Sequence, residues 1–275
     1  MQTVELLRRI AEQIRPVSKD ETLYESKLML ASLIGTDPGA VSPFSDISLN
    51  DRQQAALRSA VSRRREGYPL QYILGEWSFM GLMFYTDPCA LIPRGDTEFL
   101  AETAVKIIRE KNGQTALDLC AGTGCIGISL AKLTGISVTL TDIDPDCCEL
   151  IRTNAARNGV SVSVCRGDMF QAVPEGKYDL IVSNPPYIPS DTIPLLEREL
   201  SYEPLLALDG GEDGLDFYRV IADQYRDRLN PGGTLLMEIG YDQAESVPKL
   251  FHKGRVLTDY GGNPRVVWIE RDDDG

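Results

Sequence analysis

The sequence predicts an α/β fold, in which a mostly parallel β-sheet is covered by helices on both faces and is preceded by a small N-terminal helical bundle. From Thr115 onward, segments typical of strands and of helices alternate along the chain. That order favours parallel strands joined by crossover helices. Before residue 73, aliphatic residues recur at the three- and four-residue spacing of amphipathic helices.

The helical region covers residues 1–73 and contains three predicted helices. Their sequences are TVELLRRIAEQI, ETLYESKLMLASLI and LNDRQQAALRSAVSRRREG. Asp20 and Asn50 stand where N-caps are expected, whereas Gly35 and Gly67 stand where helices are expected to end. We therefore expect a first domain that is a small helical bundle.

Residues 74–93 have a different character. The stretch WSFMGLMFYTDPCALIP is aromatic and rich in β-forming residues, and Gly81 is suited to a turn. We predict a short β-hairpin here, which links the bundle to a second domain formed by residues 94–275.

Within the second domain, seven segments are typical of strands and four of helices. The predicted strands are 115–120, 137–143, 162–168, 178–183, 232–240, 254–260 and 265–271. The predicted helices are 125–133, 145–159, 214–229 and 242–251, and Pro145 suits a first helical turn. The result is a doubly covered, mostly parallel sheet.

Composition excludes several classes of function. The net charge of −13 disfavours free double-stranded nucleic acid as a general partner, and the only dense basic stretch is SRRREGYP at residues 62–69. No apolar run approaches the ~20 residues that span a bilayer, and the N-terminal residues lack the apolar core of a signal peptide. We therefore expect a cytoplasmic protein without a membrane partner.

The metal-binding and nucleophilic residue types are sparse. The six cysteines form no CxxC pair, and His252 is the single histidine. We expect structural thiols, no disulfide framework and no metal site, and a Ser/His/Asp relay is disfavoured.

A glycine loop follows the first predicted strand of the second domain. ALDLCAGTGCIG places Gly122, Gly124 and Gly127 in a GxGxxG pattern between strand and helix. Glycines at such a junction allow a tight turn and let a ligand approach the backbone closely. Packing of the helix against the strand is the alternative reason for small residues here.

Acidic residues at the ends of neighbouring strands favour the ligand-binding interpretation. Asp142 ends the second strand, 18 residues after Gly124, where a carboxylate can bind both hydroxyls of a ribose. Asp168 ends the third strand, where an adenine amino group can be recognised. Both residues lie at carboxyl ends of strands, the edge at which open α/β sheets bind ligands.

Two cofactors suit this edge, a nicotinamide dinucleotide and S-adenosylmethionine. Asp118 lies inside the first strand, four residues before Gly122. A carboxylate so close to the loop would repel a pyrophosphate, whereas it suits the positive amino group and sulfonium of S-adenosylmethionine. We therefore favour S-adenosylmethionine, with a local capping role for Asp118 as the alternative.

The stretch SNPPYIP follows the fourth predicted strand and so lies at the same edge. Pro185 and Pro186 lack N–H groups and form a stiff segment with bare carbonyls, and the side chain of Asn184 offers a further acceptor. Two acceptors at a fixed separation can hold both hydrogens of a planar NH₂ group, and Tyr187 can stack on its plane. Such a clamp orients a weakly nucleophilic nitrogen against a methyl donor without a strong base. A strand-terminating turn is the alternative.

With these motifs, the chain resembles the methyltransferases that modify a glutamine side-chain nitrogen in peptide chain release factors. The resemblance extends over nearly the whole length. It includes DLCAGTGCIGISLA, NPPYIP, YILGEWSFMGLMF, LIPRGDTE, EPLLALDGGEDGLDFYR, LNPGGTLLMEIGYDQ and the terminal RVV. The glycine loop and NPPY occur in many enzymes that methylate NH₂ nitrogens, whereas LIPRGDTE and EPLLALDGGEDGL are much more specific to this group.

The resemblance implies a seven-stranded, Rossmann-like methyltransferase domain whose N-terminal bundle helps dock the release factor. The glutamine of a Gly-Gly-Gln loop would meet Asn184, Pro185, Pro186 and Tyr187, with Asn184, Pro185 and Tyr187 catalytic. Cofactor contacts would fall on Cys120, Ala121, Gly122, Thr123, Gly124, Asp142, Ile143, Asp168, Met169 and Asn184, in addition to Asp118.

Three positions depart from the family pattern. Cys120 replaces the first glycine of the loop, Gly95 replaces the second proline of PRPDTE, and Met169 stands where an aromatic residue is common. The residue at 120 is still small and Met169 can still pack on adenine, whereas Gly95 should make its segment more flexible.

The long segment between Tyr187 and Asp213 has the length of a functional lid, with a surface helix at LLERELSYEP as the alternative. Glu203 and Pro204 are expected near the substrate entry.

Other functions explain fewer of these residues. An enzyme acting on a nucleobase amine would use the same NPPY chemistry, but it needs a basic groove. A nicotinamide oxidoreductase explains the glycine loop but neither Asp118 nor NPPY, and a non-catalytic binding module leaves Asn184 and Tyr187 unexplained. Within the family, a glutamine methyltransferase of a ribosomal protein would carry the same motifs.

Overall fold

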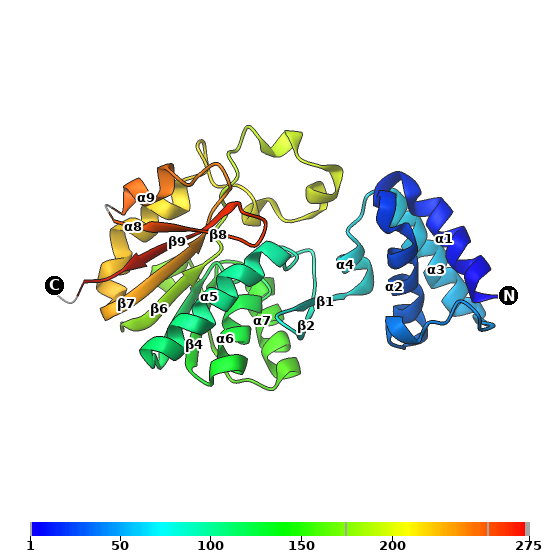
Figure 1. Ribbon diagram of the computed structural model, residues 1–275, viewed down its shortest axis with the longest axis horizontal. Helices are drawn as coiled ribbons and strands as arrows, with labels where there is room; N and C mark the ends of the chain where they lie inside the picture. The colour runs from blue at the N-terminus through cyan, green and yellow to red at the C-terminus, as the bar shows by residue number, and fades with distance from the viewer. Residues whose placement is uncertain (1, 174, 252, 273–275) are drawn as a thin grey trace. The chain divides into compact units, whose positions relative to one another are not determined.

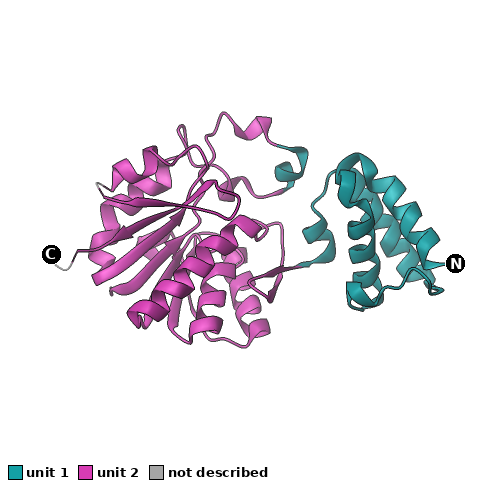
Figure 2. Ribbon diagram, viewed as in Figure 1, with its two compact units in different colours: residues 1–76, 197–202 teal, residues 77–196, 203–275 magenta. Residues whose placement is uncertain are grey.

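A computed structural model describes residues 2–173, 175–251 and 253–272 (Figure 1). They form two compact units, shown in different colours in Figure 2. The first unit contains residues 1–76 together with 197–202, and the second contains residues 77–196 and 203–275. The single histidine, His252, lies outside the described residues.

The first unit is a small helical bundle, as the sequence predicts. Its helices are α1 (Thr3–Ser18), α2 (Thr22–Ile34), α3 (Asp51–Arg65) and α4 (Leu70–Leu74). Their aliphatic faces meet in one core that includes Ile10, Ile14, Leu30 and Val61.

The predicted helix ends are confirmed at three positions and wrong at a fourth, and one of the three is Gly67, which follows α3 with a φ of 86°. Asn50 caps α3 in a capping box with Gln53, and Gly35 ends α2 in the left-handed conformation. The expected cap at Asp20 is wrong, because α1 extends to Ser18 and a 3₁₀ turn, Lys19–Glu21, leads directly into α2. Asp20 lies inside that turn, and Glu21 rather than Asp20 is the residue just before α2.

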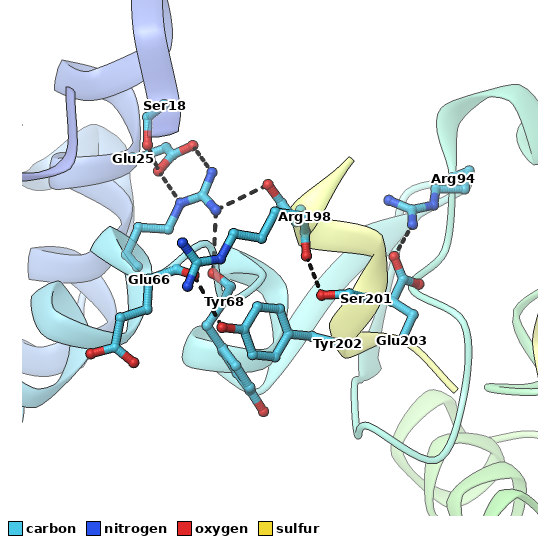
Figure 3. Close-up of polar contacts among 11 residues, drawn as sticks. Ser18, Glu25, Glu66, Tyr68, Arg94, Arg198, Ser201, Tyr202 and Glu203 are labelled. Atoms are coloured by element: carbon cyan, nitrogen blue, oxygen red, sulfur yellow. Dashed lines mark hydrogen bonds and ion pairs between the residues drawn. The ribbon is translucent and has the colours of Figure 1, made fainter. Parts of the chain in front are cut away.

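A buried ion pair lies inside this bundle. The Arg64 guanidinium donates to both carboxylate oxygens of Glu25, over 2.7 and 2.8 Å, and Ser18 donates to the same carboxylate. Arg64 and Glu25 are both more than 90% buried. Figure 3 shows Ser18 and Glu25 grouped at this site. Arg64 also donates to Glu199, which comes from the segment 197–202 that belongs to this unit.

Tyr202 adds to the packing of that segment within the first unit. Its hydroxyl donates to the carbonyl of Glu66 over 3.0 Å, and its ring packs edge-on against Tyr68. Residues 197–202 are therefore held by both a charged and an aromatic contact.

The second unit is built on a seven-stranded sheet of order β5-β4-β3-β6-β7-β9-β8. The strands are β3 (Thr115–Leu119), β4 (Ser137–Asp142), β5 (Ser163–Arg166), β6 (Tyr178–Ser183), β7 (Leu229–Glu238), β8 (Arg255–Thr258) and β9 (Pro264–Glu270). The pairs among β3 to β7 are parallel, and β9 runs antiparallel to β7 and β8. The predicted mostly parallel sheet is confirmed.

Helices cover both faces of this sheet. One core cluster contains residues of α5 (Gly95–Lys111), α6 (Cys125–Thr134) and α7 (Pro145–Asn158), and a second contains residues of α8 (Asp216–Arg228) and α9 (Ser246–Leu250). Along β3, Ala116 belongs to the first cluster and Leu117 to the second, as the alternation of a strand requires. None of the helices in the described part of the chain is long and apolar enough to cross a membrane.

Helix α5 was not among the elements that the sequence predicted. It begins at Gly95, and the preceding Arg94 makes no side-chain cap. The N-cap signal is therefore missing, although Asp96 and Glu98 lie in the first turn and Leu100, Ala104 and Ile108 form a buried face at helical spacing.

A two-stranded sheet, β1 (Glu76–Phe79) and β2 (Leu82–Tyr85), precedes α5. Its turn residues Met80 and Gly81 both have positive φ, the conformation of a tight hairpin turn. The side chain of Asn154 on α7 pairs with both the N–H and the carbonyl of Tyr85. The end of β2 is therefore held against α7 of the same unit.

We predict that Arg64→Ala destabilises the helical bundle by about 3–5 kcal/mol, because it leaves the Glu25 carboxylate buried without its partner. The matched control is Arg65→Ala, which changes an exposed neighbour and should cost less than about 0.5 kcal/mol. Urea unfolding, monitored by amide hydrogen exchange in α2 and α3, measures the free energy of unfolding of both variants. Equal effects of the two substitutions would contradict the role of the pair.

Candidate functional site

A cavity of about 740 Å³ opens at the carboxyl ends of β3, β4 and β6 in the second unit. β4, the next strand along the chain, pairs with one side of β3, and β6 pairs with the other side. This reversal of strand order is the place where open α/β sheets bind ligands, and the volume is in the range of ligand pockets. The predicted site residues that line the cavity are Cys120, Ala121, Gly122, Thr123, Asp142, Ile143, Asp168, Met169, Asn184 and Pro186.

Four predicted residues lie outside that lining, namely Asp118, Gly124, Pro185 and Tyr187. Asp118 is fully buried in β3, where one carboxylate oxygen accepts the N–H of Gly127 over 2.8 Å. Its other oxygen has no hydrogen-bond partner among the described residues. Burial, together with the nearby charge of Asp142, raises the pKa of Asp118 to about 8, against the lowering effect of the Gly127 N–H.

The glycines of the loop serve different purposes. Gly122 and Gly124 both have positive φ, of 54° and 80°. A Cβ on Gly124 would lie 2.9 Å from the side chain of Ile128, so this glycine allows α6 to pack. A Cβ on Gly122 would meet nothing closer than Ala90, at 3.8 Å, so Gly122 presents open backbone to the cavity. Cys120 adopts a φ of 57°, which explains why a glycine suits this position.

Asp142 fixes the shape of this loop. One carboxylate oxygen accepts the N–H of Gly122 over 2.8 Å, and the other accepts the N–H of Asp144 over 3.0 Å. Burial raises the pKa of Asp142, while these two N–H groups lower it. Each oxygen keeps a lone pair, so the carboxylate can still accept from hydroxyl groups in the cavity.

Asn184 follows β6 directly and is held in one orientation. The hydroxyl of Ser183 donates to the carbonyl of Leu119, which ties the end of β6 to β3. The Nδ2 of Asn184 donates to the hydroxyl of Thr97 over 3.2 Å. Because Nδ2 is bound to Thr97, the Oδ1 of the same amide is turned away from Thr97 and is the acceptor left for a ligand.

Thr97 was not predicted as a site residue, and it belongs to LIPRGDTE. The other polar residues of this motif also make long-range contacts. Asp96 pairs with Arg265 over 2.9 Å, and Glu98 accepts the N–H of Met80 over 2.6 Å. The motif thus connects the terminal RVV segment, the hairpin and NPPY.

The segment between residues 188 and 212 contributes a second wall. It forms three short 3₁₀ turns, Ile193–Leu195, Arg198–Tyr202 and Leu205–Ala207, rather than the single surface helix considered above. Leu205, Leu206 and Ala207 line the cavity. Before them, the buried Glu203 accepts from Arg94 and from the N–H of Ile92, two residues of the cavity lining.

EPLLALDGGEDGL packs on the backbone of NPPY. A Cβ on Gly210 would lie 2.8 Å from the Cα of Tyr187, and a Cβ on Gly214 would collide with the carbonyl of Tyr187. The side chain of Gln243 donates to that carbonyl over 3.1 Å. Gly210 and Gly214 thus allow close packing against Tyr187, and the Gln243 amide holds its carbonyl by a hydrogen bond.

A buried acid lies behind NPPY. Glu238 ends β7, is 2% exposed and accepts a long hydrogen bond of 3.5 Å from the hydroxyl of Tyr187. Burial raises the pKa of Glu238 to about 7, against the lowering effects of the Thr97 hydroxyl and of Arg265. The described residues contain no group of three or more His, Cys, Asp or Glu that could hold a metal ion.

Comparison with known proteins identifies the family. The release factor glutamine methyltransferase of Geobacter sulfurreducens is 42% identical over 231 residues, which cover 83% of this chain and 81% of that protein. The chain belongs to the release factor glutamine methyltransferases. The family member of Aquifex aeolicus is 31% identical over 274 residues, which cover 97% of this chain and 95% of that protein.

Family models match both parts of the chain, and solved structures share its fold. Residues 5–75 match the PrmC N-terminal domain, and residues 96–194 match the methyltransferase small domain. A methyltransferase from Pyrococcus furiosus shares the fold with a TM-score of 0.53 at 18% identity, over 81% of this chain and all of that one. A 16S rRNA methyltransferase of T. thermophilus gives a TM-score of 0.54 at 17% identity, over 71% and 49% of the two chains.

We predict that Gly214→Ala destabilises the second unit far more than Gly135→Ala. The two glycines have nearly equal φ, 73° and 75°, so both substitutions cost about 1–2 kcal/mol of backbone strain. Only at Gly214 does the new methyl group also collide with the carbonyl of Tyr187, whereas nothing lies within 4 Å at Gly135. Chemical denaturation measures the difference, and equal losses would show that Gly214 is not pressed against NPPY.

Proposed function

We propose that this protein transfers the methyl group of S-adenosylmethionine to the side-chain amide nitrogen of the glutamine in the Gly-Gly-Gln motif of peptide chain release factors. The observation that carries the proposal is the orientation of Asn184. Its acceptor Oδ1 is left for a ligand at the cavity, next to a proline segment that offers only carbonyls. A site of this kind selects a ligand that has two hydrogens on one planar nitrogen.

The residues of the cavity fit S-adenosylmethionine. Asp142 keeps lone pairs for the two ribose hydroxyls, and Ile143 and Met169 provide apolar surface for the adenine, next to Asp168. The bare backbone of Gly122 allows close approach of the methionine part. When bound, the cofactor supplies a methyl group on a positively charged sulfur. A cation above the loop also favours the charged form of Asp118 beneath it.

The clamp addresses the weak nucleophilicity of an amide nitrogen, whose lone pair is delocalised into the carbonyl. Hydrogen bonds to Asn184 Oδ1 and to the carbonyl of Pro185 hold both N–H groups and favour the positive charge that grows on nitrogen. S-adenosylmethionine would supply the methyl group to the nitrogen lone pair and would keep the electron pair of the carbon–sulfur bond on its sulfur, while one N–H proton of the amide would leave to water. Fixed placement of the nitrogen supplies much of the acceleration.

The partner follows from the family and from the charge of the chain. The relatives are named for their action on release factors, and the net charge of −13 disfavours a free nucleic acid. We propose that the N-terminal bundle, which matches the PrmC N-terminal domain, helps dock the release factor.

The direct test is mass spectrometry after mixing the protein, S-adenosylmethionine and candidate release factors. We expect one added methyl group on the Gly-Gly-Gln peptide, and none on a release factor whose glutamine is replaced by alanine. Methylation of a ribosomal protein or of a nucleic acid, with every release factor unmodified, would overturn the proposal.

We predict that Asn184→Ala lowers turnover by about 100- to 1000-fold, the loss typical of removing one positioned hydrogen-bonding group from a transition state. Binding of S-adenosylhomocysteine, measured by calorimetry, should remain largely intact. An equal loss of turnover and of cofactor binding would instead make Asn184 chiefly a cofactor residue.

A further inference from the structure

Arg94 is the only basic residue among the described residues that line the cavity. The acidic residues of the same lining are Asp142, Asp144, Asp168, Asp209 and Asp216. We propose that the Arg94 guanidinium binds the carboxylate at the methionine end of S-adenosylmethionine. This inference rests on the use of S-adenosylmethionine and is independent of which protein is methylated.

The cofactor carries charges of both signs at its methionine end. The sulfonium and the protonated α-amino group are cations, and the α-carboxylate is ionised near neutral pH. The two cations suit a cavity that is lined by aspartates, whereas these aspartates repel a carboxylate. A basic side chain at the methionine end would therefore complete the charge match between the cavity and the cofactor.

The backbone of the glycine loop has few donors to offer this carboxylate. The N–H of Ala121 donates to the carbonyl of Thr141 over 2.9 Å, and the N–H of Gly124 donates to the carbonyl of Ala121 over 2.8 Å. The N–H of Gly122 donates to Asp142 over 2.8 Å. Backbone N–H groups of such loops commonly bind anions, but these three are used within the protein. An anion therefore needs a donor from a side chain.

Arg94 belongs to the part of the lining that joins the glycine loop to NPPY. A Cβ on Gly122 would lie 3.8 Å from the Cβ of Ala90, so the segment that leads to Arg94 runs beside the open backbone of the loop. Further along the chain, the carbonyl of Arg94 accepts the N–H of Thr97, the residue that holds Asn184. The sulfonium and its methionine chain would bind between these two motifs, next to Arg94.

A buried acid orients the Arg94 side chain. Glu203 accepts from Nη2 of Arg94 and from the N–H of Ile92, and its side chain is fully buried. Figure 3 shows the Arg94 guanidinium pointing at the Glu203 carboxylate. The two hydrogens of Nη2 belong to different edges of the guanidinium, so one edge with two donors remains for a second carboxylate. The Arg94 side chain is 37% exposed, which leaves this edge accessible to a ligand.

A purely structural ion pair is the alternative role of Arg94. The buried Glu203 carboxylate needs a cation, and Arg94 meets this need with or without a ligand. The two roles differ in what they predict for ligand binding. A structural pair would not distinguish a ligand that has the carboxylate from one that lacks its charge, whereas a binding residue would.

The first test compares two ligands of the wild-type protein by calorimetry. S-adenosylhomocysteine has the carboxylate, and its methyl ester has the same skeleton without the negative charge. We expect the ester to bind about 10- to 100-fold more weakly, the effect of losing hydrogen bonds between charged groups. Equal affinities would overturn the proposal without any substitution in the protein.

The second test asks whether this loss arises at Arg94. Arg94→Met should weaken the binding of S-adenosylhomocysteine by about 10- to 100-fold and leave the ester nearly unaffected, so the difference between the two ligands should disappear. 5′-Methylthioadenosine lacks the amino acid part and should bind wild type and variant equally, which also shows that the variant is folded. A difference that persists at its wild-type size would mean that the carboxylate binds elsewhere, and the proposal would be wrong.

Two further variants complete this comparison. Arg152→Met is the matched control, because it removes the same charge from an exposed part of α7, where Arg152 pairs with Glu149. It should change each affinity by less than about twofold, and a loss equal to that of Arg94→Met would contradict a specific contact. Arg94→Lys keeps a cation beside Glu203 if the methionine variant does not fold. Because lysine has no two-donor edge, it should reduce the difference between acid and ester, and an undiminished difference would contradict the assignment.

A role of Arg94 in binding the release factor would give a different result. The affinity for S-adenosylhomocysteine would then be unchanged in Arg94→Met, and only the KM for the release factor would rise, which would also overturn the proposal. The binding measurements contain no protein substrate. Their outcome therefore does not depend on whether a release factor proves to be the protein that is methylated.

Discussion

The hydrogen bond from the Asn184 amide to the Thr97 hydroxyl is the contact on which the arrangement of this site depends. It spans 87 positions of sequence and joins the first turn of α5 to the end of β6. With Nδ2 committed to Thr97, the Asn184 amide has one acceptor left for a ligand. The neighbouring prolines have carbonyl acceptors and no N–H donors. The rim of the cavity therefore suits a planar NH₂ group, which has two hydrogens to donate.

Residues of LIPRGDTE and EPLLALDGGEDGL make this contact or pack next to it. LIPRGDTE supplies Thr97, and its Asp96 is held by Arg265 from the last strand. EPLLALDGGEDGL supplies Gly210 and Gly214, whose missing side chains let the backbone of Tyr187 pass. These interactions are made by residues far from each other in sequence. Thr97, Gly210 and Gly214 all contact the same short segment, residues 184–187.

The distance in sequence between contacting residues explains which parts of the fold and of the site could be predicted from the sequence and which could not. The strand 178–183 was predicted with its observed bounds, because an apolar run ends at NPPY, and its end fixes where Asn184 lies. Helix α5 was missed because it starts on a glycine without a cap. Thr97 carries no local signal, since its contact with Asn184 joins two elements that are far apart in sequence. Asp118, assigned to the cofactor from its spacing, is fully buried and does not line the cavity, because one of its oxygens accepts the N–H of Gly127.

A crystal structure of this protein with S-adenosylhomocysteine and a peptide that contains Gly-Gly-Gln would test the role of Asn184 most directly. We predict that the glutamine side-chain nitrogen lies about 2.7–3.2 Å from both Asn184 Oδ1 and the carbonyl oxygen of Pro185, and that Asn184 Nδ2 still donates to Thr97. A glutamine nitrogen that contacts neither acceptor, or an Asn184 amide that presents Nδ2 to the peptide, would contradict it.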